Sequence, residues 1–79
     1  MTPDRFDVLI KVLFRRRPFV MFTIFLHGGK ALEIDHPSVL SMKSGLAMMK
    51  SPGGKLVYFD GLSVSHVADG PAEHADEPL

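Results

Sequence analysis

The apolar positions of residues 4–15 recur at i, i+3, i+4, i+7 and i+8, the spacing of an amphipathic helix. They are Phe6, Leu9, Ile10, Leu13 and Phe14. Thr2 or Asp4 can cap the N-terminus of this helix, and Pro18 cannot continue it. We therefore expect one N-terminal helix, which covers one face of the strands that follow.

Residues 18–34 read PFVMFTIFLHGGKALEI, which is an apolar stretch, two glycines and a second apolar stretch. The pattern predicts a β-hairpin with the two glycines as its central turn residues, because glycine readily adopts positive φ. In that register Phe25 faces Leu32, so that Phe25, Leu32 and Ile34 share one face of the sheet.

The first strand of this hairpin is apolar on both faces, since Phe22, Ile24 and Leu26 occupy the face opposite Phe25. An antiparallel strand with one solvated face alternates between apolar and polar residues instead. Both faces therefore need cover, either from the helix and a barrel interior or from another copy of the chain. We expect the chain to bury this surface by joining copies of itself or another molecule.

The rest of the chain alternates short apolar stretches with turn residues. The second strand begins at Lys30, and Pro37 predicts a bend near His36, because proline cannot donate to a strand ladder. The strand resumes at residues 39–43, and further strands are expected at residues 46–50, 55–59 and 62–67. The predicted fold is mainly β: an N-terminal α-helix followed by a five-stranded, strongly bent antiparallel sheet that closes into a small barrel.

Charge divides the 79 residues into two parts. Residues 1–68 hold nine Lys and Arg against five acids, a balance of +4, whereas residues 69–79 hold four acids and no base, a balance of −4. We therefore expect a barrel domain over residues 1–68 and a disordered acidic tail over residues 69–79. The tail either keeps the protein soluble or folds back onto the basic residues and competes with a bound polyanion.

Composition limits the chemistry of the chain. It has no cysteine, which excludes disulfides and fits a cytoplasmic location, and its longest uncharged apolar run is about half the length of a membrane span. The four histidines lack the spacing of a zinc motif, and no serine stands in a nucleophile motif. We expect no enzyme, no metal and no cofactor.

Three consecutive arginines, residues 15–17, follow the predicted helix. Guanidinium groups bind phosphates through paired hydrogen bonds, so this cluster is a candidate contact for RNA. A solvated helix end is the alternative, because cations also complement the helix dipole there. Phe25, Tyr58 and Phe59 are candidate stacking platforms for unpaired bases, although aromatic residues are more often part of a core.

The helix that ends in arginines, FTIFLHGGKALEI in the first hairpin and KLVYFDGLSVSHV in the last two strands resemble the bacterial Hfq branch of the Sm-like proteins over residues 6–68. The order of arginines, Gly-Gly turn and His-Pro also resembles short bacterial Sm-like proteins of unassigned function. The resemblance implies a non-catalytic RNA-binding protein that forms a homo-oligomeric ring by pairing its fourth and fifth strands. The RNA contacts expected from the resemblance and the charge pattern are Arg15, Arg16, Arg17, Phe25, Lys30, Leu32 and Tyr58.

The sequence departs from the Hfq pattern at three positions. Phe59 and Asp60 replace a lysine and a histidine, and Ile34 replaces the glycine at which the second strand bends. The first two changes remove the groups expected to contact uridine. A structural or protein-interaction module that uses the same barrel without nucleic acid is therefore the alternative function.

Overall fold

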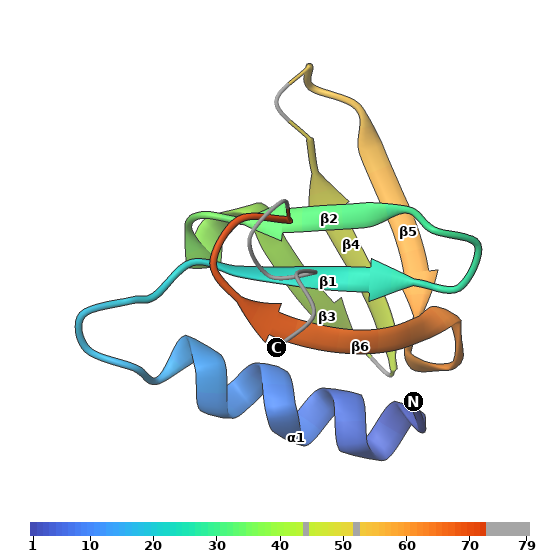
Figure 1. Cartoon of the computed structure of the whole chain (residues 1–79), viewed down its shortest axis with the longest axis horizontal. Helices are drawn as coiled ribbons and strands as arrows, with labels where there is room; N and C mark the ends of the chain where they lie inside the picture. Colours follow the sequence, from blue (N-terminus) through green and yellow to red (C-terminus); the bar gives the residue numbers. More distant parts are fainter. Residues whose placement is uncertain (44, 52, 73–79) are drawn as a thin grey trace.

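The computed structural model describes residues 1–43, 45–51 and 53–72. Its elements follow one another from the N-terminal helix to the last strand (Figure 1). They are α1 (Pro3–Phe14), β1 (Phe22–Leu26), β2 (Ala31–Ile34), the 3-10 turn η1 (Pro37–Val39), β3 (Leu40–Lys43), β4 (Leu46–Lys50), β5 (Leu56–Asp60), the 3-10 turn η2 (Gly61–Ser63) and β6 (Val64–Asp69).

The strands form two antiparallel three-stranded sheets (Figure 1). Sheet A has the order β2-β1-β6, and sheet B has the order β3-β4-β5. The prediction of a helix followed by a mainly β fold is confirmed. The prediction of five strands in a closed barrel is wrong, because the second strand is divided by η1 at Pro37 and the two sheets do not close within the described residues.

The first hairpin forms where it was predicted, but its register is shifted by one residue. Leu26 N donates to the Lys30 carbonyl oxygen at 2.8 Å, so the loop holds three residues rather than two. Phe25 therefore pairs with Ala31, and Leu32 pairs with Ile24. The prediction that Phe25, Leu32 and Ile34 share a face is wrong, since a one-residue shift moves every side chain of β2 to the other face.

The core lies between the two sheets and is closed by α1, as the helical pattern predicted. Phe6 packs against Phe59 of sheet B with ring centroids 5.8 Å apart, and Phe14 packs against Phe22 of sheet A at 6.3 Å. The largest fully buried side chains are Phe6, Ile10, Phe22, Thr23, Ile24, Ile34 and Val64. The helix thus packs against both sheets. It also lies close to η2, because a β-carbon on Gly61 would lie only 2.7 Å from the Cα of Pro3.

The described chain continues past β6 as residues 70–72. The tail acids Glu73, Asp76 and Glu77 lie outside the described residues. Helix α1 spans twelve residues, and no helix of the described chain has the length and hydrophobicity needed to cross a bilayer.

Candidate nucleic-acid interface

A groove of about 1240 Å³ lies between sheet A and the β4–β5 hairpin. The β4–β5 hairpin extends past β2 (Figure 1). Phe25 and His66 line it from sheet A, and Lys30 lies at the start of β2. Lys50 and Lys55 line it from the hairpin. We call Lys30, Lys50 and Lys55 the groove lysines.

An aromatic pair lies on the sheet A side of the groove. Phe25 on β1 is opposite His66 on β6, and the two rings stack with centroids 4.4 Å apart and planes 12° from parallel. Phe25 is only 9% exposed, whereas His66 is exposed. A flat ligand on this surface would therefore contact the imidazole of His66 rather than the ring of Phe25.

The groove lysines are exposed and have no carboxylate within ion-pair distance among the described residues. The groove also holds two acids, Glu33 on β2 and Asp35 after it. The Glu33 carboxylate accepts a hydrogen bond from Ala72 N at 2.9 Å. Positive charge is thus available at the hairpin and at the start of β2, and negative charge lies toward the end of β2.

The chain after β6 crosses the outer face of sheet A. Gly70, with φ of 89°, donates its N–H to the carbonyl oxygen of Met21 at 2.9 Å. The Thr23 hydroxyl donates to the Gly70 carbonyl oxygen at 2.7 Å. These bonds hold the chain against β1 and place Ala72 on the wall of the groove.

The arginines of residues 15–17 are used within the chain. Arg16 is 27% exposed, and its two terminal nitrogens bond both oxygens of Asp69 at 3.0 and 3.1 Å. It also donates to the Val20 carbonyl oxygen. Arg17 donates to the carbonyl oxygen of Phe14 at 3.0 Å and so caps the end of α1. Only Arg15 is exposed with no side-chain hydrogen bond among the described residues.

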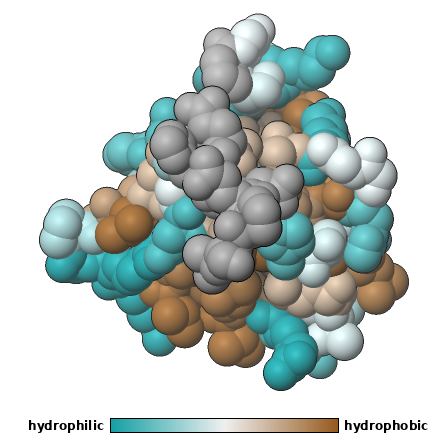
Figure 2. All heavy atoms as spheres, viewed as in Figure 1, coloured by the Kyte–Doolittle hydropathy of each residue, from teal (hydrophilic) through white to brown (hydrophobic). Residues whose placement is uncertain are grey.

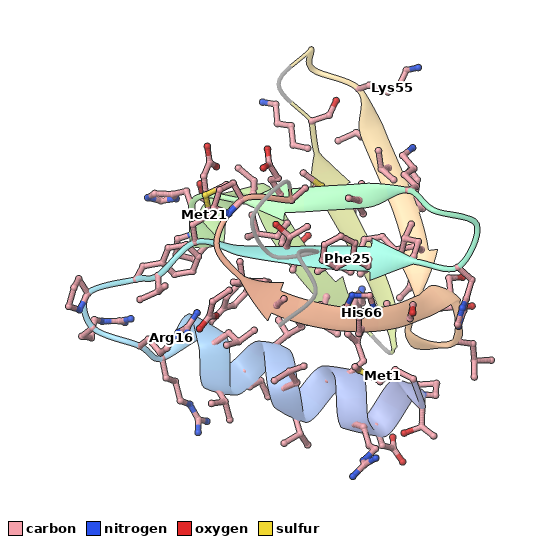
Figure 3. All side chains as sticks on the ribbon, viewed as in Figure 1. Met1, Arg16, Met21, Phe25, Lys55 and His66 are labelled. Carbon is pink, nitrogen blue, oxygen red and sulfur yellow. The ribbon has the colours of Figure 1, made fainter. Side chains whose placement is uncertain are left out.

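The seven predicted contact residues do not form one surface. Phe25 and Lys30 lie in the groove, and Leu32 lines it from the core with 5% of its surface exposed. Tyr58 is 60% exposed but pairs with Met48 on the outer face of sheet B. Figure 3 shows Arg16 near the helix end and Lys55 at the tip of the hairpin, on opposite sides of the molecule.

Three groove residues, His66, Lys50 and Lys55, were not among the predicted contacts. Isolated residues of these types carry no sequence motif, and only the β1–β6 register and the hairpin bring them together.

The predicted need for an external cover over Phe25, Leu32 and Ile34 was also wrong, since all three are buried within the single chain. His66 covers Phe25, and the other two face the core.

The other groups considered for chemistry have local structural roles. His36 accepts a hydrogen bond from Ser38 N and caps η1, and Asp60 accepts one from Ser63 N and caps η2. In residues 1–43, 45–51 and 53–72, no three metal-ligating side chains form a cluster that could hold an ion. His74 lies outside the described residues.

The groove combines exposed ammonium groups with an exposed aromatic ring. Ammonium groups bind phosphate oxygens, and an aromatic ring stacks on an unpaired base. This combination suits a single-stranded polyanion that carries flat groups. In comparisons with known proteins, no family model matches the chain, and neither a curated protein nor a solved structure matches it.

Proposed function

We propose that this protein is a non-catalytic, Sm-like (Hfq-like) RNA-binding protein that acts as a homo-oligomer and holds single-stranded RNA in the groove. The observation that carries the proposal is that the exposed ring of His66 and the groove lysines, which have no ion-pair partner in the described part of the chain, line one groove. The absence of cysteine supports a reducing, cytoplasmic location.

The lysines supply the part of binding that does not depend on sequence. Each phosphate that a lysine neutralises releases counterions, and the affinity for RNA then falls with salt. Lys50 and Lys55 belong to the same hairpin and both line the groove, so a strand held there can reach both ammonium groups. The arginines are poorer candidates because Arg16 and Arg17 are already bonded within the chain.

His66 supplies a stacking surface. Its partner Phe25 is fixed in β1, and the stacked contact holds the imidazole parallel to the ring of Phe25. Stacking of a base on an aromatic side chain is worth about 1–3 kcal/mol and tolerates any base. The groove therefore favours single-stranded RNA, because the bases of a duplex are not free to stack on it.

The Sm-like part of the proposal depends on the order of elements. A helix, a bent second strand and a 3-10 turn before the last strand give two small sheets whose free end strands include β5 and β6. Pairing β5 of one copy with β6 of the next would satisfy both edges. Exposed apolar residues support such an assembly: Leu46, Leu56 and Tyr58 on sheet B, and Val8 and Val12 in the hydrophobic surface over α1 (Figure 2).

The test is a titration of labelled oligoadenylate and oligouridylate, followed by fluorescence anisotropy. We expect single strands to bind more tightly than a duplex of the same length, and Lys55→Glu to weaken binding at least about tenfold. Lys43→Glu is the matched control, since Lys43 is exposed on β3 but does not line the groove. Absence of binding, or an equal loss in both variants, would contradict the proposal.

A second candidate is a protein-interaction module without nucleic acid. It is favoured by the apolar outer face of sheet B, where Leu46, Leu56 and Tyr58 are about half exposed or more. A defined protein that co-purifies with the chain, at an ultraviolet absorbance ratio typical of protein alone, would support it. Loss of that partner on Tyr58→Ser would assign it to this face.

A further inference from the structure

Strand β2 has an unpaired edge that faces the groove. It is the end strand of sheet A, with β1 on its other side. Leu26 and Lys30 form a hydrogen-bonded pair, and hydrogen-bonded and non-hydrogen-bonded pairs alternate along an antiparallel ladder. Lys30 and Leu32 therefore bond to β1, whereas Ala31 and Glu33 occupy the non-hydrogen-bonded positions. The backbone N–H and C=O groups of Ala31 and Glu33 therefore point away from β1 and into the groove. Within the described residues no strand pairs with this edge.

The space beside this edge fits an added strand. The β4–β5 hairpin extends past β2 (Figure 1), and Met49 and Val57 line the groove between the hairpin and sheet A. A strand placed on β2 would alternate its side chains between two directions. One set would lie on Met49 and Val57, continuing the core, and the other set would reach the rim where Lys50 and Lys55 lie.

We propose that β2 accepts an extended acidic polypeptide as an added strand, and that this strand competes with RNA for the groove. The free edge supplies main-chain hydrogen bonds, which RNA cannot match. The groove holds three lysines against two acids, Glu33 and Asp35, so it favours acidic side chains near the hairpin and Lys30. The apolar floor favours alternating apolar ones. The competition rests on the proposed RNA function, whereas the added strand does not. The protein would then bind RNA or an acidic partner, but not both at once.

The test uses the full chain and a fluorescent, end-capped peptide of alternating glutamate and valine. We expect binding by anisotropy, and slowed hydrogen exchange at the Ala31 and Glu33 amides in the complex. A peptide of the same sequence, N-methylated at alternate residues, lacks the donors on one edge and should bind at least about tenfold more weakly. A peptide of alternating lysine and valine tests the charge preference and should bind more weakly still.

The added strand would be overturned by a peptide affinity that N-methylation leaves unchanged, or by hydrogen-exchange rates at Ala31 and Glu33 that do not change on binding. Absence of peptide binding would overturn it as well. The competition has its own arm, in which the glutamate peptide should release bound oligoadenylate in proportion to its occupancy. A chain that binds the peptide but no RNA would keep the added strand and overturn the proposed RNA function.

Discussion

The two basic regions of the molecule, the arginines of residues 15–17 and the groove lysines, carry similar charge but differ in their contacts. Arg16 and Arg17 bond carboxylate and carbonyl oxygens of their own chain. The lysines have no ion-pair partner among the described residues and surround a hollow. Consecutive arginines are the more conspicuous feature of the sequence, but Arg17 caps the end of α1 and Arg16 bonds Asp69 at the end of β6.

The difference shows that local charge density does not identify a binding surface. A cation stabilises the folded chain when it contacts the C-terminal carbonyl groups of a helix or pairs with a carboxylate. Lys50 and Lys55, near the tip of a hairpin, have no such partner among the residues that the structure describes. Variants of the two basic regions should therefore differ in what they lose, RNA affinity in the groove and stability at the helix end.

Replacing His66 should have the largest effect on RNA binding. His66→Ala removes the exposed stacking surface, and we expect about a 5- to 150-fold loss of affinity for oligoadenylate. His66→Phe should restore most of it, because the ring is retained. Anisotropy titrations measure the change, and His36→Ala is the control, since that exposed histidine lies outside the groove. Equal losses in both histidine variants would contradict the assignment.

Replacing Arg16 should lower stability rather than RNA affinity. Arg16→Ala leaves Asp69 and the Val20 carbonyl oxygen without their donor. We expect the free energy of unfolding in urea to fall by about 1 kcal/mol, since Asp69 is largely exposed and water replaces part of the interaction. Arg16→Lys should recover only part of this loss, because an ammonium group lacks the planar fork. Unchanged stability with weaker RNA binding would place Arg16 in the interface.

Arg17 should contribute less to stability. Its guanidinium caps the Phe14 carbonyl oxygen from an exposed position. Arg17→Ala should therefore lower the free energy of unfolding by about 0.3–1 kcal/mol. The same urea titration measures the change, and the loss should shrink at high salt as the charge is screened.

Arg15 should have the smallest effect of the three. It is exposed and makes no side-chain bond among the described residues. We expect Arg15→Ala to change the free energy of unfolding by less than about 0.5 kcal/mol. A larger loss of RNA affinity than that of Lys55→Ala would show that the helix end, and not the groove, binds phosphate.

The sequence predicted the elements better than their faces. Helical spacing, the Gly-Gly turn and Pro37 located α1, the turn of the first hairpin and the break in the second strand to within about two residues, but β1 begins at Phe22 rather than at Pro18. The register failed because two adjacent glycines allow both two-residue and three-residue loops, and only the Leu26–Lys30 hydrogen bond distinguishes them. That single residue decides which side chains of β2 enter the core.

The site was harder to predict than the fold. Lys30 was among the predicted contacts and lines the groove, whereas Lys50, Lys55 and His66 come from segments that meet only through sheet pairing. The ion pair between Arg16 and Asp69 could not be predicted from the sequence either. Its partner Asp69 is 53 residues away and reaches it only because β6 pairs with β1.

The salt dependence of RNA binding in two matched double variants decides whether the groove lysines or the arginines of residues 15–17 bind phosphate. Lys50→Ala with Lys55→Ala removes two groove cations, and Arg15→Ala with Arg17→Ala removes two from the helix end. We expect the slope of log affinity against log salt to fall by about 1.4 in the lysine variant, about 0.7 for each phosphate that is no longer neutralised. The arginine variant should keep the slope of the unaltered chain. A fall confined to the arginine variant would contradict the account.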